Sequence, residues 1–144
     1  MAKPKVQAEI VPNQHCRQYH TNWKMSDERV GQMLEGYMCS DEQEALNKAP
    51  EVTKRIAIGV LGIVGVVNFS LNGYQLQVVK APLFDWEEIE PQIIGLIRMV
   101  GQEFLSEEVE YIEKPIWEFQ KWGYNEDGTK RRRGMFEETF DDLD

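Results

Sequence analysis

The sequence predicts an α+β domain in which two β-hairpins alternate with two main helices. Residues 6–23 alternate loosely between apolar and polar around a turn at residues 12–15. Residues 66–80 do the same around Asn72-Gly73, the strongest short hairpin signal that a sequence offers. Residues 86–104 are instead apolar at helical spacing. A chain of 144 residues, 42% of them apolar, can form one domain with a buried core and some additional sequence.

The first hairpin is predicted to join strands at residues 6–12 and 16–23. Pro12 and Asn13 suit its turn, because proline presets φ and asparagine tolerates left-handed geometry. From Ser26 the period changes, and apolar residues follow at intervals of three, four and seven. This spacing predicts a short amphipathic helix within residues 24–39, capped by Ser26.

Two further helical segments are predicted before the second hairpin. Ser40 and Gln43 have the spacing of a capping box for a short helix that ends at Lys48. Pro50 interrupts this run and starts the next helix, because proline is tolerated in a first turn but costs about 3 kcal/mol inside a helix. Three glycines weaken the end of that helix, which places the transition to a strand at residues 61–65. Its apolar face comprises Val52, Ile56, Val60 and Ile63.

The second hairpin is predicted to join strands at residues 66–71 and 74–80. A type I′ turn between them needs positive φ at both Asn72 and Gly73. The alternation of the second strand places one set of side chains on the core face and leaves the other set mostly in water. The core set comprises Tyr74, Leu76 and Val78.

The longest predicted helix begins after Asp85, which stands three residues before Glu88 in a cap-plus-acid pattern. Its apolar stripe continues to Phe104. Pro91 lies past the first turn, where proline removes a hydrogen bond. The opening turn is therefore loose, or the regular helix begins nearer Glu90.

The last part of the chain, residues 107–144, is predicted to be an aromatic and charged extension of a domain that spans residues 1–106. Residues 107–112 extend the helix or form an edge strand. The aromatic rings that follow form a binding surface, since tryptophan and tyrosine dominate binding hot spots, or they pack onto the open face of the sheet. The predicted partner contacts in this segment are Trp117, Phe119, Trp122 and Tyr124.

The net charge of −9 and the pI of about 4.8 oppose nonspecific binding to nucleic acid or to an anionic membrane. A basic partner or a cation is the complementary ligand. No run reaches the roughly 18 apolar residues of a membrane span, and the first residues are not followed by the apolar core of a signal peptide. We therefore expect a cytoplasmic protein with no membrane partner, in which Cys16 and Cys39 are reduced thiols.

His15, Cys16 and His20 form the one constellation with metal-ligand chemistry, and Cys39 completes a set of four ligands. On a strand, however, Cys16 and His20 share a face while His15 points away, and the spacings match no common zinc or iron–sulfur pattern. Ordinary turn and strand positions account for these residues better, so we expect no bound metal, with iron as the alternative. Nucleophilic catalysis by Cys16 needs an orienting group and an oxyanion hole that the sequence does not locate, and we expect no enzyme.

A series of turn and packing residues follows this order along the chain: Pro12-Asn13, Ile63, Gly65-Val66, Lys80, Asp85-Trp86, Ile89, Pro91 and Ile93. In this set, and in the order of its elements, the sequence resembles the N-terminal domain of the Nfu/NifU-type iron–sulfur scaffold proteins. The match covers residues 6–104, with residues 24–39 as an insertion. The second Pro-Asn of the family's first turn is not kept.

Together these features predict a two-layer α+β domain. Its sheet is four-stranded and mostly antiparallel, in the order β-β-α-β-β-α, with the helices on one face, an inserted helix and a C-terminal extension. Turn and packing residues identify a fold better than an activity.

The resemblance implies an association with iron–sulfur cluster assembly or delivery. The family's scaffolds hold their cluster through a Cys-x-x-Cys pair in a second domain, and this sequence contains no such motif. It binds no cofactor in that manner, so the expected partner is another protein, either a Cys-x-x-Cys scaffold or an iron–sulfur client. Pro12, Asn13 and Lys80 are further predicted contacts of this partner. The alternative is a general protein-interaction module that uses its aromatic extension.

Overall fold

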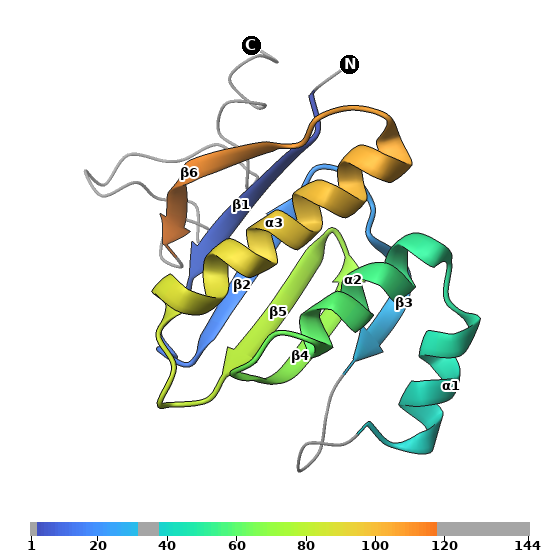
Figure 1. Cartoon of the computed structure of the whole chain (residues 1–144), viewed down its shortest axis with the longest axis horizontal. Coiled ribbons are helices and arrows are strands. Elements are labelled where there is room, and N and C mark those ends of the chain that lie inside the picture. Colours follow the sequence, from blue (N-terminus) through green and yellow to red (C-terminus); the bar gives the residue numbers. More distant parts are fainter. Residues whose placement is uncertain (1–2, 32–37, 118–144) are drawn as a thin grey trace, which may run out of the picture.

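The computed structural model describes residues 3–31 and 38–117. In this part of the chain, six strands form one mixed sheet in the order β3-β4-β5-β2-β1-β6. Helices α2 and α3 lie side by side over one face of the sheet, and α1 lies beside β3 (Figure 1). The strands are β1 (Lys5–Ile10), β2 (Cys16–Thr21), β3 (Ser26–Gly31), β4 (Val66–Gly73), β5 (Gln75–Lys80) and β6 (Glu110–Trp117), and the helices are α1 (Ser40–Lys48), α2 (Glu51–Leu61) and α3 (Trp86–Leu105).

The α+β class is confirmed, but the four-stranded sheet is wrong because β3 and β6 extend it at both edges, and the parallel pairing of β6 with β1 makes the sheet mixed. Strand β3 stands where a helix was predicted, and it pairs antiparallel with β4 through Val30 and Leu71. The apolar spacing from Ser26 is helical, but pairing with the free edge of β4 overrides this local preference and buries Val30. Strand β6 runs parallel to β1, so the first part of the predicted extension belongs to the sheet.

Both predicted hairpins form, with one change in turn geometry. Strands β1 and β2 pair antiparallel, and in their turn the Asn13 side chain accepts a hydrogen bond from the backbone amide of His15 at 2.9 Å. In the β4–β5 hairpin, Asn72 pairs with Gln75, so the two turn residues are Gly73 and Tyr74. The type I′ prediction is wrong, because only Gly73 takes a positive φ there, of 60°. Glycine at the first central position is the requirement of a type II′ turn.

The helices begin and end close to their predicted limits. Helix α1 spans Ser40–Lys48, but its cap residue is Cys39 and the Gln43 side chain donates to the Met38 carbonyl at 2.7 Å, so the predicted capping box does not form. Helix α3 begins directly after Asp85 and contains Pro91. The Asp85 carbonyl accepts from the Glu88 amide at 3.0 Å and, in the regular helical pattern, from the Ile89 amide at 3.3 Å, so the helix is already formed in its first turn despite Pro91.

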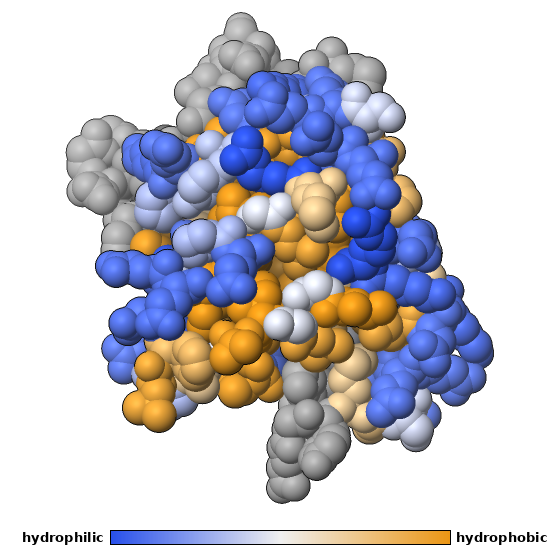
Figure 2. Space-filling view, in the orientation of Figure 1, coloured by the Kyte–Doolittle hydropathy of each residue, from blue (hydrophilic) through white to orange (hydrophobic). Residues whose placement is uncertain are grey.

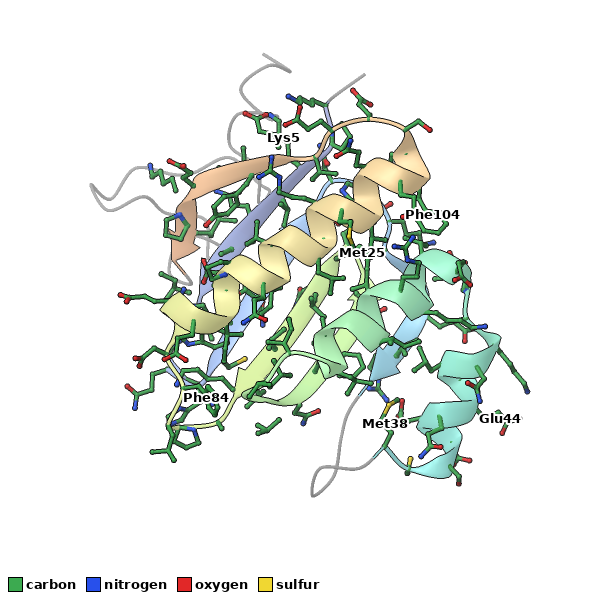
Figure 3. The ribbon with its side chains drawn as sticks, in the orientation of Figure 1. Lys5, Met25, Met38, Glu44, Phe84 and Phe104 are labelled. Atoms are coloured by element: carbon green, nitrogen blue, oxygen red, sulfur yellow. The ribbon has the colours of Figure 1, made fainter. Side chains whose placement is uncertain are left out.

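The core lies between the sheet and the two covering helices, and it includes the fully buried Met25 (Figure 3). Leu76 and Val78 face this core as predicted, whereas Tyr74 is 54% exposed because it belongs to the turn. Within the described residues, no helix has the length and apolarity needed to span a membrane. The fully buried side chains of the covering helices include Ile56, Ala57, Val60, Ile89, Ile93, Ile97 and Val100.

Candidate functional site: a groove between α3 and β6

A groove with a volume of about 410 Å³ runs along the side of α3 that faces β6. Helix α3 supplies one wall and Tyr111 of β6 the other, while Arg17 reaches the groove from β2. We call this feature the α3–β6 groove. Its lining residues are Arg17, Trp86, Glu87, Glu90, Pro91, Ile94, Gly95, Arg98 and Tyr111.

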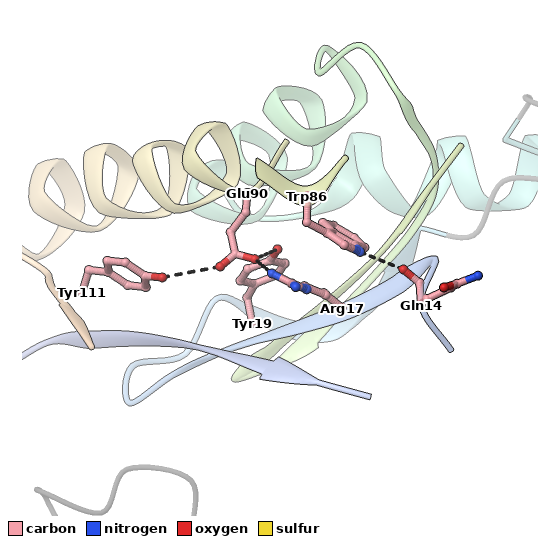
Figure 4. A network of polar contacts seen from close by, with 6 residues as sticks. All are labelled: Gln14, Arg17, Tyr19, Trp86, Glu90 and Tyr111. Carbon is pink, nitrogen blue, oxygen red and sulfur yellow. Dashed lines mark hydrogen bonds and ion pairs between the residues drawn. The ribbon is translucent and has the colours of Figure 1, made fainter. Parts of the chain in front are cut away.

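Glu90 is the centre of the polar network at the base of the groove (Figure 4). Its Oε2 atom accepts hydrogen bonds from the Arg17 guanidinium and, at 3.3 Å, from the Tyr19 hydroxyl. Its Oε1 atom accepts a longer bond of 3.5 Å from the Tyr111 hydroxyl. One carboxylate on α3 therefore joins β2 and β6, with the side chains of Arg17 and Glu90 only 24% and 16% exposed.

Trp86 fixes the opposite end of the network. Its indole N–H donates to the Gln14 carbonyl at 2.9 Å, which ties the first turn of α3 to the β1–β2 turn. The Arg17 guanidinium lies 5.2 Å from the centre of the Trp86 ring, and the Lys80 ammonium lies 6.0 Å from it. Cations at such distances are attracted to the ring face, so Trp86 has a fixed position before any ligand arrives.

The two tyrosines act as hydrogen-bond donors toward Glu90. Burial, followed by the Glu90 charge, raises the pKa of the Tyr19 hydroxyl above its usual range. The pKa of Tyr111 is raised by the same two causes in the same order. Both hydroxyls therefore keep their protons at neutral pH and can donate hydrogen bonds to the Glu90 carboxylate.

Three of the predicted partner contacts, Pro12, Asn13 and Lys80, lie at or beside the β1–β2 turn, which Trp86 also contacts. Pro12 and Asn13 are exposed in the β1–β2 turn, and the Lys80 backbone amide donates to the His15 carbonyl at 2.8 Å. Lys80 itself is only 7% exposed. Its role as a partner contact stays a prediction, as do the roles of Pro12 and Asn13.

The other predicted contacts fall at the end of the described chain or beyond it. Trp117 is the last residue of β6. Phe119, Trp122 and Tyr124 lie outside the described residues, so their use by a partner also stays a prediction.

Sequence reasoning missed Arg17, Glu90 and Tyr111. The available signal was positional, since Trp86 and Glu90 stand four residues apart on one helix face and Arg17 and Tyr19 share one face of a strand. Only the structure brings these pairs together.

The proposed metal ligands do not meet in one place. Cys16 and His20 share the sheet face that points away from the helices, where His20 Nε2 lies 2.6 Å from Glu9 Oε1. His15 lies in the β1–β2 turn, and the exposed Cys39 caps α1. Among the residues that the structure describes, no group of three or more histidine, cysteine, aspartate or glutamate side chains is placed to hold a metal ion.

The two free thiols should differ sharply in reactivity. Burial is the main cause that raises the pKa of Cys16, the nearby Glu9 charge adds to it, and a hydrogen bond with Gln77 opposes it. Only the thiolate is nucleophilic, and Cys16 is also 6% exposed, whereas Cys39 is exposed. With Ellman's reagent at pH 8 we expect the Cys39→Ser variant to react at least about a hundredfold more slowly than the Cys16→Ser variant. Fast reaction of Cys16 would instead indicate an activated nucleophile.

Comparison with known proteins places the chain beside two solved structures. No family model matches it, and no curated protein matches its sequence. It is similar to the solution NMR structure of a NifU-like protein from Saccharomyces cerevisiae, with 16% identity, a TM-score of 0.46, and coverage of 78% of this chain and 87% of that one. It is also similar to the X-ray structure of protein SAV1430 from Staphylococcus aureus, with 14% identity, a TM-score of 0.41, and coverage of 64% and 96%.

Proposed function

We propose that this protein is a non-enzymatic, scaffold-like accessory of iron–sulfur cluster assembly or delivery that acts by docking another polypeptide. The observation that carries the docking part is the α3–β6 groove, because residues of the sequence motif meet there. Trp86 and Pro91 line the groove, and Lys80 lies beneath the Trp86 ring. In this proposal, residues that in the sequence seemed to serve only turns and packing also contribute to a docking surface.

The groove is suited to docking because its walls are held in place. Trp86 is anchored by a hydrogen bond and a stacked guanidinium, and Tyr111 is oriented by Glu90. A rigid aromatic wall loses little conformational entropy when a partner binds, which leaves more of the contact energy for affinity. Beside it, the exposed Pro91 and Gly95 of α3 and the largely buried Ile94 offer the apolar area to be covered.

The assembly part of the proposal rests on the sequence resemblance. The chain carries two cysteines and no Cys-x-x-Cys pair, and these two thiols do not share a site. In this proposal the cluster ligands belong to the partner, either a Cys-x-x-Cys scaffold domain or an iron–sulfur client. The present chain then contributes recognition rather than metal chemistry.

The direct experiment titrates the purified protein with a Cys-x-x-Cys scaffold domain of the NifU type, anaerobically, in its cluster-loaded and apo forms. We expect saturable binding by calorimetry, weakened at least about tenfold by Gly95→Leu, which places a side chain in the groove. A Cβ at Gly95 meets no atom within 4 Å, so the substitution fits the fold. Gly95→Ala is the matched control, since it removes the same glycine and adds only one methyl group.

Two results would contradict the proposal. Absence of binding to both forms of the scaffold domain would remove the assembly role. Binding that survives Gly95→Leu but is lost when Trp117 and Trp122 are both replaced by alanine would move the docking surface to the aromatic extension and favour the general interaction module.

A further inference from the structure

The interior of the α3–β6 groove is apolar and has unused space. Trp86, Pro91 and Ile94 line it together with Gly95. Because a Cβ at Gly95 would meet nothing within 4 Å, the groove is open above this residue. A site with an aromatic wall, an aliphatic floor and free space takes an apolar side chain as its anchor.

The two guanidinium groups of the groove are already engaged by the chain itself. Arg17 pairs with Glu90 and stacks on Trp86. Arg98 donates from Nε to the Val109 carbonyl at 2.9 Å and lies 3.5 Å from a Glu108 carboxylate oxygen. Neither cation is therefore left without a partner to attract an acidic ligand.

Two carboxylates form no such ion pair within the described residues: Glu87 in the lining of the groove and Glu113, two residues after Tyr111 on β6. Glu87 lines the groove from α3 and is exposed. Glu113 is exposed on β6, close enough to Tyr111 that its charge adds to the effects of burial and of Glu90 on the pKa of that hydroxyl. Within residues 3–31 and 38–117, neither carboxylate forms an ion pair with a lysine, arginine or histidine. These two carboxylates attract a basic ligand, and the net charge of −9 adds to this attraction at longer range.

We infer that the occupant of the groove is a basic segment of a partner protein. It carries one large apolar side chain, seated over Gly95 beside Pro91 and Ile94, and has lysine or arginine on both sides to meet Glu87 and Glu113. The inference rests on the proposed function only in taking the groove as a docking site, and it holds for any partner with this segment. Complementary charge of this kind mainly accelerates association and selects the partner, while the buried anchor supplies the affinity.

Fluorescence anisotropy with labelled synthetic peptides of equal length tests this inference. One peptide places a phenylalanine between pairs of lysine and arginine, a second keeps the phenylalanine between glutamates, and a third keeps the basic residues but replaces the phenylalanine with serine. We expect the first peptide to bind at least about tenfold more tightly than the other two, with an affinity that falls as salt rises. Equal binding of the glutamate peptide, or no binding of the first, would overturn the inference.

Variants locate the interaction within the protein. Glu87→Lys combined with Glu113→Lys should weaken the first peptide at least about tenfold and flatten its salt dependence. The matched control, Glu28→Lys with Glu51→Lys, changes the net charge equally at exposed positions of β3 and α2 and should change the affinity less than about threefold. An equal loss of peptide affinity in the two double variants would mean that overall charge, not the groove, attracts the peptide.

Two more comparisons complete the test. The first asks whether the groove binds a partner's basic segment or the chain's own basic run, and the second asks whether the inference and the assembly role fail separately. If the peptide binds only after the run Lys130–Arg133 is replaced by glutamates, the occupant is this chain's own basic run, and the inference of a partner segment is wrong. If the first peptide binds the groove but no NifU-type scaffold domain does, the assembly role fails while the inference stands. If the scaffold domain binds but the first peptide does not, the inference is overturned while the assembly role stands.

Discussion

Replacing Glu90 with alanine is expected to lower the free energy of unfolding by about 3 kcal/mol. Hydrogen bonds to a charged group contribute about 1.5–3 kcal/mol each, and removal of one member of a buried pair leaves the other uncompensated. Here the change removes the acceptor of the Arg17 guanidinium, which is 24% exposed, and of the hydroxyl of the fully buried Tyr19. Urea denaturation followed by circular dichroism measures the loss.

Two further variants make the Glu90 result interpretable. Glu87→Ala removes an exposed carboxylate one turn earlier on the same helix, and surface changes of this kind stay within about 0.5 kcal/mol. Glu90→Gln keeps the size of the side chain and one acceptor oxygen, so its effect should fall between the two. A loss below about 1 kcal/mol in Glu90→Ala would show that the network does not hold α3 to the sheet.

Gly65→Ala should also destabilise the protein by about 3 kcal/mol. Gly65 has a φ of 101°, where an L-residue is strained by roughly 1–2 kcal/mol. An added Cβ would lie 2.7 Å from the Phe84 ring and 3.0 Å from Ile89, and overpacking of this kind costs about 1–3 kcal/mol. Phe84 lies beside the start of α3 (Figure 3), so the clash also disturbs the entry of the chain into this helix.

The matched control is Gly62→Ala, three residues earlier. Gly62 has a φ of −81°, and its added Cβ would lie 3.5 Å from the Gly59 carbonyl oxygen, an ordinary contact. We expect a change within about 0.5 kcal/mol by the same denaturation measurement. Equal losses at the two positions would mean that helix termination, rather than positive φ and crowding, decides the role of Gly65.

Local sequence signals predicted the elements that depend on local contacts. Helix α1 has the predicted limits, Ser40–Lys48, and the β4–β5 hairpin forms with Leu76 and Val78 inside. The structure also accounts for a glycine whose role in the sequence motif was not evident, since Gly65 needs positive φ beneath Phe84.

Edge strand β3 escaped prediction, and the edge strand at β6 was only one of two open alternatives, because the formation of both depends on distant partners. Residues from Ser26 have helical spacing, yet they pair with β4, which begins 40 residues later. The parallel pairing of β6 with β1 joins the two ends of the described chain, with Val6 opposite Tyr111. A local period carries no information about such pairing.

The groove escaped prediction for the same reason. Trp86 and Pro91 were singled out as motif residues, but the contact between Arg17 and Glu90 spans 73 positions of the sequence. Tyr111 lay in a segment for which helix and edge strand were both open. The chemistry of the site is therefore a product of the topology, which brings β2, α3 and β6 together.

A second exposed apolar surface competes with the groove as a docking site. Figure 2 shows apolar side chains gathered in the lower part of the face that α2 and α3 form. The strongly exposed apolar side chains of α2 and of the loops that follow α2 and β5 include Ile58 at 59%, Val64 at 74% and Leu83 at 95%. A measurement of where a partner binds must distinguish the two surfaces.

Nuclear magnetic resonance makes that distinction most directly. The ¹⁵N-labelled protein is titrated with an unlabelled Cys-x-x-Cys scaffold domain, and the backbone amides and tryptophan indole N–H groups are followed. Docking in the α3–β6 groove predicts the largest shifts at the Trp86 indole and at the amides of Ile94, Gly95 and Tyr111. Shifts confined to the surface around Val64 and Leu83, with those groove signals unchanged at saturation, would contradict the account.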